Sequence, residues 1–150
     1  MNDTDYMELA YKEALNVQDE KEYPVGALVL LNGEIISSSR NTVQENYDPT
    51  AHAEINAIRA ACKKISSDKL KGATLYTTLY PCPMCEGAIK ETGIEKVVYG
   101  AEPYKWVREV KFRDGTIEFT GPIMNEECRK LFADKLKALG EEYVINYENS

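Results

Sequence analysis

Apolar residues recur every three to four positions in several stretches of the chain, which is the spacing of one face of an α-helix. The first stretch predicts a helix over about 4–18, with Asp3 or Thr4 as its N-cap. The second predicts a helix that begins near Pro49 or Thr50 and turns its apolar positions inward as far as Ile65. The last, over about 124–139, has an apolar face that ends at Leu139.

Shorter runs of apolar, β-branched and aromatic residues predict strands at 25–31, 34–39, 73–79 and 95–100, with a weaker strand at 117–120. Asn32-Gly33 lies between the first two runs and is the dipeptide that a type I′ hairpin turn needs. A helix that starts within 81–85 would connect the next two strands as a right-handed crossover between parallel strands. The pattern therefore predicts an α/β class three-layer α/β/α sandwich with a mixed sheet, as a single domain over 1–150.

Composition and charge narrow the class of protein. The chain has 150 residues, of which 43% are hydrophobic and 29% charged, as in one globular domain. It contains no apolar run near the roughly 20 residues of a membrane span, and its N-terminus lacks the layout of a signal peptide, so we expect a cytoplasmic protein. A formal net charge of −7 argues against a nucleic acid as the main partner but does not exclude a local basic patch.

The chain has one histidine, His52, and four cysteines, two of which form the C-x-x-C pair Cys82 and Cys85. Cys62 and Cys128 fall at apolar helical positions and are interpreted as core residues. Alone, the pair could be a redox couple or half of a structural zinc site. With His52 it makes the three-ligand set of a catalytic zinc site, which leaves the fourth position for water.

Glu54 follows His52 by two positions, just where a helix is expected to begin. In the first turn both side chains can bend over the open helix end, so one can bind a metal while the other approaches its water. Cys82 and Cys85 also lie at a helix start, where the positive end of the dipole favours thiolates. H-x-E followed by P-C-x-x-C is a signature of zinc deaminases, in which the glutamate is the general acid and base.

With VGALV at 25–29, Asn41 and ATLYTTL at 73–79 in the same order, the chain resembles the cytidine deaminase-like superfamily from about 6 to 140. The resemblance implies a five-stranded sheet between helices, hydrolytic loss of ammonia from a nucleobase ring, one zinc ion per chain and a homodimer. It also implies that Glu54 moves protons during the reaction and that Asn41 and Ala53 contact the base.

Three branches of this superfamily are similar to the chain: cytosine deaminases, guanine deaminases and tRNA wobble-adenosine deaminases. DPTAHAEI at 48–55 and PCPMCEGAI at 81–89 are similar to guanine and tRNA enzymes, whereas ATLYTTL followed by the cysteine motif is similar to fungal-type cytosine deaminase. Tyr80 departs from the tRNA and guanine enzymes, which usually carry glutamate there. The zinc motifs alone leave the substrate open.

Two segments bear on the choice of substrate. Residues 104–113 interleave basic and aromatic side chains, which suits RNA, but they also fit a helix with Trp106 inward or against a substrate. The acidic and aromatic tail differs from the basic C-terminal helix of tRNA-binding relatives and resembles the pocket cap of free-base deaminases, although a solvated tail fits as well. Its candidate substrate contacts are Glu142, Tyr143, Tyr147 and Glu148.

On these grounds the sequence favours a zinc-dependent hydrolase that deaminates a free nucleobase or related aminated heterocycle, with cytosine ahead of guanine. A tRNA wobble-adenosine deaminase is the alternative, with RNA as the less favoured partner. A non-catalytic, zinc-stabilised interaction domain is a remote alternative, because a structural zinc site needs a fourth ligand and has no use for the carboxylate of Glu54.

Overall fold

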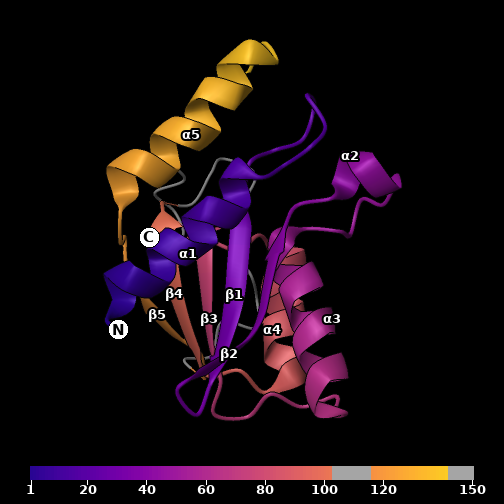
Figure 1. Ribbon diagram of the computed structural model, residues 1–150, viewed down its shortest axis with the longest axis vertical. Coiled ribbons are helices and arrows are strands. Elements are labelled where there is room, and N and C mark those ends of the chain that lie inside the picture. The colour runs from indigo at the N-terminus through magenta and orange to yellow at the C-terminus, as the bar shows by residue number, and fades with distance from the viewer. Residues whose placement is uncertain (103–115, 142–150) are drawn as a thin grey trace.

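The computed structural model describes residues 1–102 and 116–141 (Figure 1). Five strands form one sheet in the order β2-β1-β3-β4-β5. Along the chain the elements are α1 (Asp3–Leu15), β1 (Gly26–Leu31), β2 (Glu34–Arg40), α2 (Val43–Asn46), α3 (Ala53–Ile65), β3 (Thr74–Leu79), α4 (Pro83–Thr92), β4 (Lys96–Ala101), β5 (Glu118–Thr120) and α5 (Asn125–Ala138).

The sheet is mixed. β1 runs antiparallel to both β2 and β3, while β4 runs parallel to β3 and to β5. The predicted hairpin is confirmed, because Asn32 and Gly33 both have positive φ, at 52° and 78°. The predicted parallel pairing across α4 is confirmed as well, and it brings the end of β3 and the start of α4 to one edge of the sheet.

Helices cover both faces of the sheet, which confirms the predicted α/β/α sandwich (Figure 1). On one face, Met7 and Ala10 of α1 pack with Leu28, Tyr76 and Val98 of the central strands. On the other face, the apolar residues of α3 and α4 pack with Ala27, Val29, Leu75 and Val97. Within the described ranges, no helix combines the length and apolarity needed to cross a bilayer.

Several predicted helix boundaries are wrong by a few residues. α1 ends at Leu15, and its N-cap is Asn2, which exchanges hydrogen bonds with Asp5 in a capping box. The short α2 was not predicted at all, because four residues are too few to show a helical period. Ile65 and Leu139 were expected to face the core, but each is 36% exposed because each lies where its helix ends.

Some of the sequence expectations concern residues outside the described part of the chain. These are the helix predicted within 104–113, the placement of Trp106, and the candidate contacts of the tail, Glu142, Tyr143, Tyr147 and Glu148.

Candidate active site

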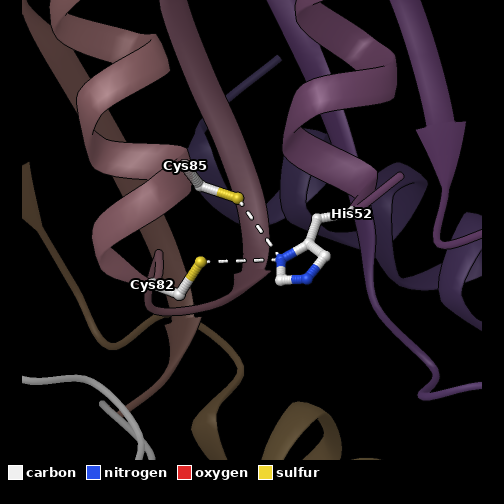
Figure 2. A group of neighbouring side chains, drawn as sticks. All are labelled: His52, Cys82 and Cys85. Carbon is white, nitrogen blue, oxygen red and sulfur yellow. Dashed lines mark hydrogen bonds between the residues drawn. The ribbon is translucent and has the colours of Figure 1, made fainter. Parts of the chain in front are cut away.

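Two helix N-termini meet beyond the C-terminal end of β3, the central strand of the sheet. His52 is the N-cap of α3 and Cys82 is the N-cap of α4, and Cys85 lies in the first turn of α4. Nδ1 of His52 lies 3.5 Å from Sγ of Cys82 and 3.5 Å from Sγ of Cys85. Figure 2 shows these three atoms turned toward one another. The sequence prediction that His52, Cys82 and Cys85 converge is therefore confirmed by the geometry.

The spacing of these three atoms fits a tetrahedral zinc ion. Zinc binds thiolate sulfur at about 2.3 Å and imidazole nitrogen at about 2.0–2.1 Å, which places sulfur and nitrogen roughly 3.5 Å apart at the tetrahedral angle. All three candidate ligand atoms lie within 4.8 Å of one another, and they form the one such His, Cys, Asp or Glu cluster among the described residues. Three protein ligands leave one position open for water, as in a catalytic site.

The surroundings shift the pKa values of the two thiols in opposite directions. Hydrogen bonds from Cys85 and then His52 lower the pKa of Cys82 to about 4. The hydrogen bond with Cys82, together with burial, raises the pKa of Cys85. Burial alone would lower the pKa of His52, but the hydrogen bond with Cys82 and nearby negative charge raise it. The pair can thus present thiolate sulfur to a cation, and the thiol proton that the two sulfurs share must leave when the metal binds.

Glu54 lies beside this cluster in the first turn of α3. Its side chain is 4% exposed, and burial raises the pKa of Glu54 to about 7. A carboxyl group that titrates near neutrality can both accept and donate a proton at the same pH, as a general acid and base must. The expected approach of His52 and Glu54 to one point is confirmed, because both line the same pocket.

The start of α3 is fixed from outside the helix. Oδ1 of Asn41 accepts a hydrogen bond of 2.6 Å from the N–H of Ala53, one of the unpaired donors of the first turn. The expectation that this helix would begin near Pro49 or Thr50 is wrong, because α3 begins at Ala53 with His52 as its N-cap. Asp48 instead accepts hydrogen bonds from the N–H and the hydroxyl of Thr50, which closes a turn ahead of the helix.

A pocket opens above Glu54 and the metal cluster. Asn41 borders it, whereas the side chain of Ala53 is fully buried and its N–H is committed to Asn41. The predicted contacts of Asn41 and Ala53 with the substrate stay predictions. The other walls come from separate parts of the chain: Tyr23, Val25, Val43, Leu79, Tyr80 and Phe132.

Sequence reasoning missed Tyr23, Val43 and Phe132, because no motif marks them and only the fold brings them together. Tyr23 and Phe132 pack with ring centroids 5.7 Å apart, which joins the segment before β1 to α5. Tyr80 was noted as a departure from related sequences. Its ring stacks on Phe119, with centroids 5.1 Å apart, and meets the edge of Tyr99 at 4.8 Å, so an aromatic cluster supports this wall.

Residues 1–101 match the family model described as the cytidine and deoxycytidylate deaminase zinc-binding region. The chain belongs to this deaminase family. The match covers both motifs of the site. The cluster of His52, Cys82 and Cys85 is the zinc-binding site that the family description names. The deaminase is therefore a zinc-dependent enzyme that hydrolyses the C–N bond of a cyclic amidine.

Related proteins within the family separate by substrate. The deaminase is 46% identical over 132 residues to the tRNA-specific adenosine deaminase of Bacillus subtilis (strain 168), which covers 82% of this chain and 81% of that protein. A solved tRNA:A34 deaminase, which edits A to I at the wobble position of transfer RNA, is 36% identical with a TM-score of 0.78, covering 85% and 99% of the two chains. The guanine deaminase of Bacillus subtilis is 41% identical with a TM-score of 0.65, covering 68% and 66%.

These similarities correct the predicted substrate. The sequence favoured a free nucleobase, cytosine ahead of guanine, but several relatives at 34–46% identity are tRNA-specific adenosine deaminases. The expectation rested on the net charge, which is a property of the whole chain, and on the acidic tail, which lies outside the described residues. The findings support the alternative, a tRNA enzyme.

Proposed function

We propose that this deaminase converts adenosine to inosine at the wobble position of a transfer RNA anticodon. The observation that carries the proposal is the 46% identity with the Bacillus subtilis tRNA-specific adenosine deaminase over most of both chains. The solved tRNA:A34 deaminase, of which this chain covers 99%, supports it. The pocket supports it as well, because a base taken out of an RNA loop can enter a site at the surface of the protein.

In this proposal Nδ1 of His52 and the thiolates of Cys82 and Cys85 hold one zinc ion per chain. The ion supplies a water molecule acidified enough to act as nucleophile near neutral pH. The neutral imidazole and two thiolates balance the charge of the metal. The N-termini of α3 and α4 both lie at this site, and the backbone N–H of Cys85 in the first turn of α4 donates to the thiolate of Cys82.

Glu54 is proposed as the group that moves protons. It accepts a proton as water adds to C6 of adenine and delivers one to ring N1, so the ring no longer carries its full aromatic bonding. It then takes the proton of the new C6 hydroxyl and passes it to the C6 amino group, the C6–N bond breaks, ammonia leaves and the C6 carbonyl forms. Adenosine and water thus become inosine and ammonia. A pKa of about 7 suits Glu54 to both halves of this sequence.

Asn41 is proposed to bind the base. Its Oδ1 is committed to the N–H of Ala53, so the amide NH₂ is the end left to donate to a ring acceptor. Val25, Leu79 and Phe132 supply apolar walls for the ring faces. The homodimer that the family resemblance implies belongs to this proposal too, and light scattering on the purified protein tests it.

The test is inosine formation by zinc-loaded protein on anticodon stem-loops. We expect turnover of a stem-loop with adenosine at the wobble position and no turnover when adenosine is placed elsewhere in the loop. Glu54→Gln is expected to keep its zinc and to lose activity by roughly 10²–10⁴-fold, because it retains the shape but not the proton transfer. Zinc content by elemental analysis and the rate of inosine formation together distinguish loss of the metal from loss of proton transfer.

Free guanine, cytosine and adenine are assayed in parallel for ammonia release. Efficient turnover of a free base with no inosine in the stem-loop would overturn the proposal. Equal activity of Glu54→Gln and the wild type would overturn the role given to Glu54, while leaving the substrate assignment open to the RNA assay.

A further inference from the structure

Tyr47 is an aromatic residue held almost entirely in water. Its side chain is 96% exposed, far more than any other large hydrophobic residue in the described ranges except Met1 at the chain end. Its backbone lies in the left-handed region, with φ 50° and ψ 42°, as the C-cap of α2. α2 projects beyond the sheet, past the end of α3 that carries the active site (Figure 1). A positive φ is uncommon for a residue other than glycine, and here it belongs to a residue whose ring is almost wholly exposed to solvent.

Tyr47 lies close to the pocket. Val43, the first residue of α2, lines the pocket together with His52 and Glu54. The N–H of Tyr47 donates to the carbonyl of Val43, so the two residues are one helical turn apart, about 6 Å along the chain surface. Tyr47 is thus one helical turn from a wall of the pocket and is not itself among the residues that line it.

The element that carries Tyr47 is anchored on several sides. Oε1 of Glu22, a side chain 1% exposed, accepts a hydrogen bond of 2.9 Å from the N–H of Gln44. The guanidinium of Arg40 binds both carboxylate oxygens of Glu45 at 3.1 Å. These contacts join α2 to the segment before β1 and to the end of β2. A ring on an anchored element loses little conformational freedom when a ligand stacks on it.

The charges beside Tyr47 are balanced. The carboxylate of Glu45 is paired with Arg40, and the carboxylate of Asp48 accepts hydrogen bonds from Thr50 and lies 3.9 Å from Arg59. This surface is therefore less acidic than the net charge of the whole chain suggests. A phosphate backbone can approach Tyr47 without meeting an unpaired carboxylate of Glu45 or Asp48.

We propose that Tyr47 is a stacking platform for a nucleobase next to the adenosine in the pocket, which rests on the proposed RNA substrate. When a loop nucleotide enters a pocket, its neighbours lose a stacking partner, and exposed aromatic rings at protein surfaces replace such partners in single-stranded RNA. A ring one helical turn from the pocket wall is within reach of the adjacent nucleotide, because successive nucleotides are separated by a comparable distance. Tyr47 would thereby recognise a loop that presents its bases unpaired and disfavour a free base, which has no neighbour to stack.

The experiment compares Tyr47→Ala and Tyr47→Phe on the wobble-adenosine stem-loop. We expect Tyr47→Ala to raise KM on the order of 5- to 100-fold with kcat nearly unchanged, because loss of one stacked base weakens binding but leaves the reacting groups in place. Tyr47→Phe keeps the ring and should behave as the wild type. Ile65→Ala shortens a partly exposed side chain at the far end of α3, about 18 Å along that helix from its start, and serves as the control.

Stem-loops with an abasic nucleotide on the 5′ or the 3′ side of the adenosine then identify the stacked base. One of them should weaken wild-type binding and make Tyr47→Ala indistinguishable from the wild type. Unchanged KM in Tyr47→Ala, or an equal effect of the variant on both abasic loops, would overturn the stacking while the wild-type turnover still upheld the tRNA function. If the wild type converts no stem-loop, the proposed function and this inference fall together.

Discussion

The N–H of Ala53 donates a hydrogen bond of 2.6 Å to Oδ1 of Asn41, and both residues are buried. The bond joins the end of β2 to the first turn of α3, the helix that carries Glu54. Asn41 therefore has two roles that chemistry can separate. Its oxygen fixes the helix end, whereas its NH₂ group is the part that a base in the pocket would meet.

Asn41→Asp should separate these roles. The aspartate keeps an acceptor for Ala53, and its charge is tolerated at a helix N-terminus, so we expect zinc content and thermal stability near those of the wild type. Activity should be lost, because no donor remains for the base. Asn41→Ala should lose activity and also about 1–3 kcal/mol of stability, since the buried N–H of Ala53 loses its partner. Equal destabilisation of both variants would show that the oxygen does not fix the helix.

Zinc content should depend on two of the four cysteines. We expect about one zinc per chain in the wild type, and far less after Cys82→Ala or Cys85→Ala, because two ligands hold the ion weakly. Cys62→Ala is the matched control, since Cys62 lies near the far end of α3 and outside the cluster. Elemental analysis of the three variants after dialysis gives the answer. Loss of zinc from Cys62→Ala alone would contradict the assigned ligand set.

Removal of the metal should destabilise the fold at the two helix starts. A chelator is expected to lower Tm, and added Zn²⁺ to restore it, because the ion binds only the folded arrangement of His52, Cys82 and Cys85. The Cys82→Ala variant should show neither response. If neither the chelator nor Zn²⁺ changes the Tm of the wild type, the cluster holds no ion in solution.

The metal cluster could be predicted from sequence because each half of it is local. His52 and Glu54 lie at one helix start and Cys82 and Cys85 at another, so each motif carries its own geometry. The exact start of α3 could not be predicted in the same way. It depends on Asn41, a residue from β2's end that reaches the helix only after the strands have paired.

The substrate could not be predicted because it depends on surfaces and not on the reacting groups. Net charge sums over the whole chain, yet the carboxylates of Glu45 and Asp48 near the pocket are paired with Arg40 and Arg59. Tyr47 also carries no periodic signal, since it follows a helix of only four residues. The family resemblance located the chemistry correctly, and the choice among branches required comparison with whole relatives.

Gly26 allows α1 to lie directly on β1, and its replacement should be costly. A Cβ at Gly26 would overlap the carbonyl oxygen of Ala10 and lie 2.7 Å from the backbone nitrogen of Ala14. Because backbone atoms cannot rotate away, Gly26→Ala should lose about 2–3 kcal/mol, a fall in Tm of roughly 5–10 °C. Gly72→Ala is the control. It has φ +84° but no neighbour within 4 Å, so only the backbone strain of about 1 kcal/mol is expected. Similar losses in both variants would show that α1 yields to the added methyl group.

Cys128 should make the protein less stable at high pH. Its side chain is 3% exposed, and burial raises the pKa of Cys128 to about 12, whereas an unfolded cysteine titrates near 8.5. The unfolded state therefore loses its proton first, so stability is complete below about pH 8.5 and falls as the pH rises toward 12, by up to about 1.4 kcal/mol per pH unit.

Urea unfolding of the wild type and Cys128→Ala under reducing conditions measures this effect. Between pH 8.5 and 10 the wild type should lose about 1.5 kcal/mol more than the variant. Other groups with raised pKa values, such as Tyr76 with its hydrogen bond to Asp3, are common to both proteins and cancel in the difference. The variant has a lower free energy of unfolding because the substitution leaves a small cavity beside the sheet. The comparison therefore uses the slope of that free energy against pH and not its absolute value. Parallel curves for the two proteins would mean that Cys128 ionises as freely in the folded state as in the unfolded chain.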